Sequence, residues 1–93
     1  MKAKRLSDGG IAWWCPACDR AHRSDGRWQF NGDFNAPTFN PSFNVAPIVD
    51  DKGHVLRPRC HSTITDGRAA FANDSGHALA GKTVDIPDWP FSA

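Results

Sequence analysis

Four cysteine and histidine residues of this protein have types and spacing that suit a metal site. Cys15 and Cys18 form a C-x-x-C knuckle within the stretch WWCPACDRAH. Tetrahedral zinc takes four such ligands, and a knuckle of this kind supplies two of them. Cys60 is the natural third ligand. We predict His77, in the segment DSGH, as the fourth, because a turn there can bring its ring back over the strand of Cys60.

Two other histidines are alternatives for the fourth ligand. His22 follows the knuckle closely, and His61 is adjacent to Cys60. His61 is the weaker of the two, because neighbouring residues of a strand face opposite ways. A site made of four protein ligands leaves no open position for substrate. The sequence therefore predicts a structural Zn²⁺ and assigns no catalytic residue or other cofactor.

The cysteine count also bears on redox chemistry and compartment. Three cysteines is an odd number, and the sequence shows no secretory signal. This combination favours a cytosolic protein with reduced thiols over a disulfide scaffold. A redox C-x-x-C motif sits at the N-terminus of a helix. Here the motif leads into the turn-rich stretch DRAHRSDG, which argues against a redox role.

A catalytic metal is the alternative from a different functional class. His61, Asp74 and His77 could surround a metal-bound water in a metal-dependent hydrolase. The sequence has no glutamate to act as general base and no H-E-x-x-H motif. Asp74 also has a simpler role, capping the turn that begins at Ser75. The sequence thus favours a protein that is not an enzyme, with the hydrolase as the alternative.

The composition indicates which elements must position these ligands. The 93 residues suffice for a single domain, and with no glutamate its 10 acidic residues are all aspartate. Aspartate favours turns, and the 8 glycines and 7 prolines favour strands and loops over helices. We predict a small β-rich, zinc-stapled domain of hairpins with little helix over residues 11–93. A flexible basic arm over residues 1–10 precedes it.

Two stretches predict the hairpins of this domain. A first strand is expected at 11–14, and RSDGRWQF has the pattern of a hairpin around a D-G turn. The clearest hairpin is RCHSTITDGRAAFAND, with Asp66-Gly67 as its turn. That turn pairs Ile64 with Ala69 and Ser62 with Phe71. Strand alternation then points Cys60 toward the apolar face and His61 away from it.

Charge and hydropathy limit the partners. A formal charge of +1 gives no general attraction to nucleic acid, and no apolar stretch is long enough to span a membrane. Arg20, Arg23 and Arg27 lie near tryptophans, a combination found in single-strand binding proteins. Asp19 and Asp25 dilute this patch. We therefore predict a protein partner ahead of nucleic acid. The sequence does not indicate an oligomeric state.

Several segments resemble a family of small uncharacterised proteins common in bacteriophages and prophages. They are WCPACDRAH, WQFNGDFNAPTFNPSF, CHSTITDGRAAFANDSGHALAGKTV and DIPDWP. Such proteins are often labelled ammonia monooxygenase, which is a membrane-bound copper complex and does not fit this sequence. The resemblance implies a single domain of phage or prophage origin. Together with the metal site, it leads us to expect a binding or accessory module in the cytoplasm of a bacterial host cell, with a host or phage protein as its partner.

Overall fold

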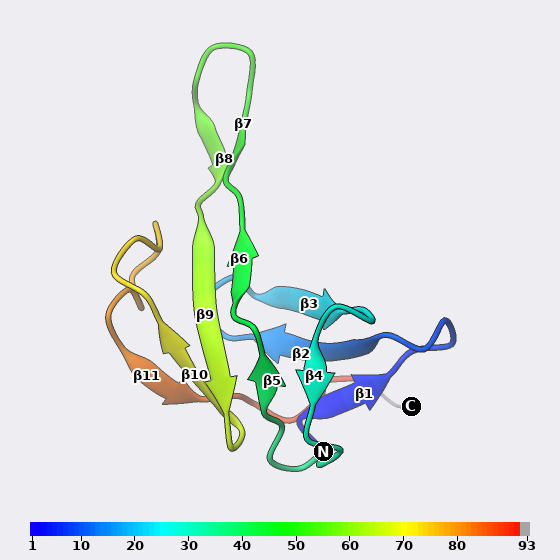
Figure 1. Cartoon of the computed structure of the whole chain (residues 1–93). Helices are drawn as coiled ribbons and strands as arrows, with labels where there is room; N and C mark the ends of the chain where they lie inside the picture. The colour runs from blue at the N-terminus through cyan, green and yellow to red at the C-terminus, as the bar shows by residue number, and fades with distance from the viewer. Residues whose placement is uncertain (92–93) are drawn as a thin grey trace.

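The computed structural model describes residues 1–91, which form strands, turns and loops without a helix (Figure 1). The prediction of a small β-rich domain with little helix is confirmed. That prediction extended the domain to residue 93, and residues 92–93 lie outside the described range. Within residues 1–91 no helix is long and apolar enough to cross a membrane.

Three antiparallel strands form the N-terminal sheet, in the order β1 (Ala3–Arg5), β2 (Ile11–Cys15) and β3 (Arg20–Ser24). β1 belongs to residues 1–10, the predicted basic arm, and its Ala3 is fully buried. Backbone N–H groups of Lys2 and Ala3 donate to the carbonyl of Phe34 at 2.8 and 3.0 Å. These contacts hold β1 against the body of the domain.

The second sheet has four strands, in the order β11 (Thr83–Asp85), β10 (Arg68–Phe71), β9 (Cys60–Thr65) and β6 (Phe43–Val45). The β9–β10 hairpin has the predicted register, with Ile64 opposite Ala69 and Ser62 opposite Phe71. Its turn residues Asp66 and Gly67 have φ angles of 51° and 78°, the left-handed geometry that D-G turns supply.

Two further strand pairs complete the fold. β4 (Gln29–Phe30) pairs with β5 (Phe39–Asn40), and β7 (Ile48–Val49) pairs with β8 (Val55–Arg57). β3 and β4 are not paired with each other, although the sequence predicts a hairpin there. β3 pairs with β2, while Trp28, which precedes β4, stacks on Phe43 at 5.1 Å between ring centroids. The β7–β8 hairpin projects from the body as an arm (Figure 1).

Aromatic side chains fill the space between the sheets. Trp13 is fully buried, and Phe43 contacts it edge-to-face with centroids 5.5 Å apart. Phe39 and Phe71 are also buried, as is Ile64 of β9. Each large side chain of this kind contributes about 1.5–3 kcal/mol by leaving water. This core fixes the inner face of β9, and Cys60 lies on that face with 1% exposure, as predicted.

Candidate functional site

Three cysteines and one histidine converge between the two sheets. The ligand atoms of Cys15, Cys18, His22 and Cys60 all lie within 4.8 Å of one another, and the group could hold a metal ion. Cys15 ends β2, Cys18 lies in the following turn and His22 is in β3, so one hairpin supplies three members. Cys60, the first residue of β9, comes from the other sheet.

The hairpin register explains why His22 belongs to this cluster. Trp13 lies opposite His22 and Cys15 lies opposite Arg20, so the side chains of all four residues share the inner face. The knuckle between the strands is tight. The Asp19 N–H donates to the Cys15 carbonyl at 2.9 Å, and Asp19 has a φ of 53°. This turn brings Cys18 back toward Cys15.

The three thiols influence one another's protonation. A hydrogen bond from Cys60 Sγ lowers the pKa of Cys15 to about 4, against the effect of burial and with the help of His22. The same hydrogen bond raises the pKa of Cys60, and burial raises it further. Burial and the nearby Cys15 thiolate raise the pKa of Cys18.

The geometry and the buried nitrogen of His22 both fit a metal ligand set. Cys15 Sγ and Cys60 Sγ are 3.9 Å apart, and all three cysteines are free thiols. Tetrahedral coordination with metal–sulfur distances of about 2.3 Å would separate two sulfurs by about 3.8 Å. His22 Nε2 is buried and has no hydrogen-bond partner. A cation at the centre would satisfy this nitrogen and let all three thiols ionise.

His77, the predicted fourth ligand, lies elsewhere. Its ring packs edge-to-face on Phe71 with centroids 4.8 Å apart, and its Nδ1 accepts a hydrogen bond from the Leu79 N–H at 3.3 Å. The structure thus brings together Cys15, Cys18 and Cys60 of the predicted set. It places His22, named in the sequence analysis as an alternative, beside them.

A second group of polar side chains lies on the opposite face of the β6–β9 pair. Ser42 Oγ is 3.2 Å from His61 Nε2, and His61 Nδ1 is 3.1 Å from Asp74 Oδ1. An ionised carboxylate only accepts hydrogen bonds, so Nδ1 carries the proton and Nε2 accepts from the Ser42 hydroxyl. A hydroxyl, an imidazole and a carboxylate thus form one continuous array, in which the imidazole can accept the proton of the hydroxyl.

Strand pairing and one buried serine position this array. Ser42 immediately precedes β6, in which Asn44 lies directly opposite His61 of β9. The loop that carries Asp74 is tied to β9 by the adjacent Ser75. Ser75 Oγ accepts from the His61 N–H and donates to the His61 carbonyl, both at 3.1 Å. The side chain of His61 is 29% exposed, so solvent and substrate can reach it.

Sequence reasoning named His61 and Asp74 together but missed Ser42. The β7–β8 arm separates β6 from β9 in the sequence, so their pairing cannot be found from local patterns. One signal was present, since Ser42 lies in the segment PTFNPS, which carries part of the family resemblance.

Comparison with known proteins identifies the family. Residues 2–72 match the model of a family described as bacterial ubiquitination-like system serine protease (BubE). The matched range includes both Ser42 and His61, and Asp74 lies just beyond it. No curated protein and no solved structure gives a match. Because the match covers most of the sequence, the protein belongs to the family of bacterial ubiquitination-like system serine proteases, BubE.

Proposed function

We propose that the protein is a serine protease in which Ser42 is the nucleophile, His61 the general base and Asp74 the group that orients His61. The observation that carries this proposal is the continuous hydrogen-bonded array from Ser42 Oγ through the imidazole to the carboxylate. The family match supports it independently, because a serine protease requires a base-activated serine.

The proposed mechanism follows from the positions of the protons. His61 Nε2 takes the hydroxyl proton as Ser42 Oγ attacks the peptide carbonyl carbon, and the carboxylate of Asp74 stabilises the resulting imidazolium. The tetrahedral intermediate collapses as Nε2 donates that proton to the leaving amine. Water then attacks the acyl-Ser42 ester, again with His61 as base. The acid product leaves and the free hydroxyl is restored.

We propose that the cysteine cluster binds Zn²⁺ in a structural role. Three thiolates and one imidazole suit zinc, and all four positions would be protein ligands, Cys15, Cys18, His22 and Cys60. Cys60 and His61 are neighbours on β9 and face opposite ways. Zinc would therefore fix the strand that carries the general base while remaining separate from the reaction.

The alternative of a metal-dependent hydrolase has less support. It requires His61 to bind a metal, yet both ring nitrogens of His61 have hydrogen-bond partners, Ser42 and Asp74. His77, the third residue of that proposal, packs on Phe71. The predicted binding module is compatible with a protease, because the protein partner would then be the substrate.

We also propose a cytoplasmic location in a bacterial cell, because the thiols of a cysteine-ligated zinc must stay reduced. A phage or prophage origin remains part of this proposal. The family description suggests that the polypeptide substrate belongs to a ubiquitination-like system.

The test is hydrolysis of unfolded casein by the zinc-loaded protein. Ser42→Ala and His61→Ala should each lower kcat by at least about 10³-fold. Ser7→Ala, which removes an exposed hydroxyl elsewhere, should leave it unchanged. Equal activity in Ser42→Ala, with unaltered circular dichroism and zinc content, would refute the proposal.

A further inference from the structure

A trough follows the free edge of β6. One hollow, with a volume of about 240 Å³, lies between β3 and β6 and is lined by residues that include Trp28, Phe43 and Asn44. A second, of about 300 Å³, lies at the base of the β7–β8 arm. Arg20, His22 and Val45 line both hollows. The two hollows therefore adjoin the same three residues, and the second also reaches Cys18 and Cys60 of the cysteine cluster. Together the two adjoining hollows are called the trough.

Unpaired backbone groups of β6 face this trough. The His61 carbonyl of β9 accepts from the Ala72 N–H at 2.8 Å, on the side away from β6. Hydrogen-bonding direction alternates along an antiparallel strand, so Phe43 and Val45 pair with β9 and the N–H and C=O of Asn44 point outward. A free edge of this kind accepts an extended polypeptide as an added strand.

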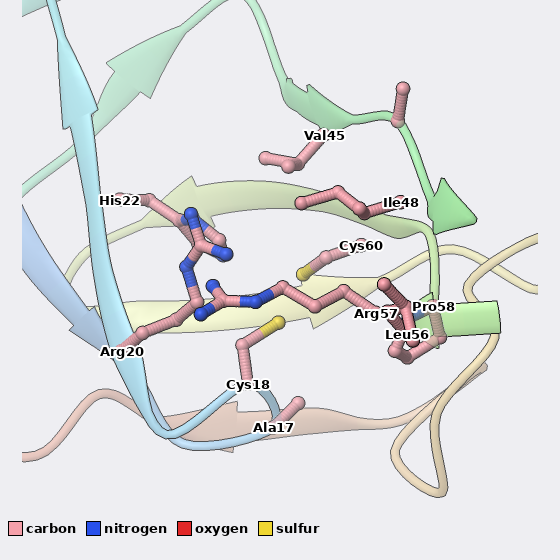
Figure 2. Close-up of a pocket in the computed structure, with 11 residues that line it drawn as sticks. Ala17, Cys18, Arg20, His22, Val45, Ile48, Leu56, Arg57, Pro58 and Cys60 are labelled. Carbon is pink, nitrogen blue, oxygen red and sulfur yellow. The ribbon is translucent and has the colours of Figure 1, made fainter. Parts of the chain in front are cut away.

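The trough carries unbalanced positive charge. Figure 2 shows the guanidinium groups of Arg20 and Arg57 extending into it from opposite sides, above the sulfur of Cys18. In residues 1–91 neither arginine takes part in an ion pair. Zinc with three thiolates would have a net charge of −1, and the two arginines add +2. The surplus of +1 suits a carboxylate ligand.

We propose that this trough binds an extended polypeptide segment, which pairs with the backbone of Asn44 and places a carboxylate against Arg20 and Arg57. The proposal rests on the proposed function, because Ser42 immediately precedes β6 and so lies at one end of the edge along which the segment would pair. From Ser42 to Ile48, in the wall of the second hollow, an extended polypeptide spans roughly 20 Å, or about six residues. The carboxylate is either an acidic side chain or the C-terminal carboxylate of the bound polypeptide.

Binding is measured with zinc-loaded Ser42→Ala protein, so that no cleavage occurs. The probes are three twelve-residue peptides of Ala, Leu and Ser that carry an uncharged BODIPY dye, followed by fluorescence anisotropy. One has a central Glu and an amidated C-terminus, one has Gln and a free C-terminus, and one has Gln and an amide. We expect the neutral peptide to bind at least 10-fold more weakly than one of the acidic peptides. The acidic peptide that binds identifies the source of the carboxylate.

Two substitutions reverse charge in the trough and one serves as a control. Arg20 lines both hollows and Arg57 lines the second, and neither belongs to the Ser42–His61–Asp74 array. We expect Arg20→Glu and Arg57→Glu each to weaken binding of the acidic peptide at least 10-fold. Thr83→Trp, on the opposite edge strand β11, should change it by less than 2-fold.

Four results would overturn the trough proposal: no peptide binds, the neutral peptide binds as tightly as the acidic ones, Arg57→Glu binds as well as the parent protein, or Thr83→Trp weakens binding equally. Zinc content is checked in each variant, so a folding defect is recognised. Because the assay needs no reactive serine, an inert Ser42 would refute the proposed protease while leaving the binding result to decide the trough.

Discussion

Replacing His22 by alanine should remove the metal, whereas replacing His77 should leave it in place. The two histidines occupy different surroundings. His22 Nε2 is buried beside three sulfurs without a hydrogen-bond partner. His77 Nε2 is likewise buried without a partner, but no cysteine cluster surrounds it in the described residues. Its ring packs on Phe71, and its Nδ1 accepts a hydrogen bond from the Leu79 N–H. The pair of variants therefore separates a ligand from a packing residue.

The expected magnitudes differ widely. His77→Ala loses one edge-to-face aromatic contact and one hydrogen bond, together about 1–2 kcal/mol. In a domain of this size that lowers Tm by roughly 4–16 °C. A structural zinc contributes on the order of 10–16 kcal/mol of binding free energy. Removing one of the four ligands should remove about a quarter of this binding free energy, roughly 3 kcal/mol, which lowers zinc affinity about 100-fold. His22→Ala also loses its contact with Trp13, with centroids at 5.1 Å.

The assay is zinc per protein molecule by mass spectrometry after dialysis against a competing chelator, together with thermal melts. We expect one zinc in wild type and in His77→Ala, and well below one in His22→Ala, which should also melt far lower. A full zinc complement in His22→Ala, or its loss in His77→Ala, would refute the ligand assignment.

The remaining predictions concern the carboxylate that orients His61, the serine that holds its backbone, the β9–β10 turn and the effect of pH. Asp74→Asn should lower kcat about 10–1000-fold with KM unchanged. This loss is smaller than the roughly 10⁴-fold loss on replacing a buried triad aspartate, because the side chain of Asp74 is 56% exposed. An unaffected kcat would remove Asp74 from the mechanism. Ser75→Ala leaves the His61 N–H unpaired and should lower the free energy of unfolding, measured in urea, by about 1–3 kcal/mol, while kcat falls and KM stays constant. Unchanged stability and kcat would contradict a positioning role for Ser75. Gly67→Ala should lower the free energy of unfolding by about 1–2 kcal/mol, because the φ of Gly67 is 78° and the new Cβ would lie 3.3 Å from Ala36 Cα. An unchanged urea midpoint would argue against the proposed geometry of the β9–β10 turn. Acidification should release zinc, because protons compete with the metal for the thiolates. The stability that zinc supplies is therefore present at neutral pH and lost as pH falls. Equal zinc content at pH 4 and pH 7 would speak against thiolate ligands.

The parts of the fold that depend on local patterns could be predicted from the sequence. The D-G turn and the alternation around it determine the β9–β10 register and the inward direction of Cys60. The same alternation, applied from Cys15 through the knuckle, would have placed His22 on the inner face. The prediction of His77 rests on a turn after the hairpin that can return over β9, but that loop packs its histidine on Phe71 instead.

The Ser42–His61–Asp74 array depends on a long-range pairing that no local pattern reveals. β6 joins β9 only after the backbone has passed through the projecting β7–β8 arm, and the register of that pairing places Ser42 beside His61. The absence of glutamate argues against a metal-assisted general base but has no bearing on a serine nucleophile. That distinction explains why the sequence favours a protein that is not an enzyme.

Labelling with a fluorophosphonate tests most directly whether Ser42 is an activated nucleophile. The reagent phosphonylates a serine hydroxyl that a nearby base deprotonates, and peptide mass spectrometry locates the adduct. The account predicts one adduct per protein molecule, on Ser42, formed at least about 10²-fold more slowly in His61→Ala. An unlabelled Ser42 in folded, zinc-loaded protein, or equal labelling of the exposed Ser7, would contradict it.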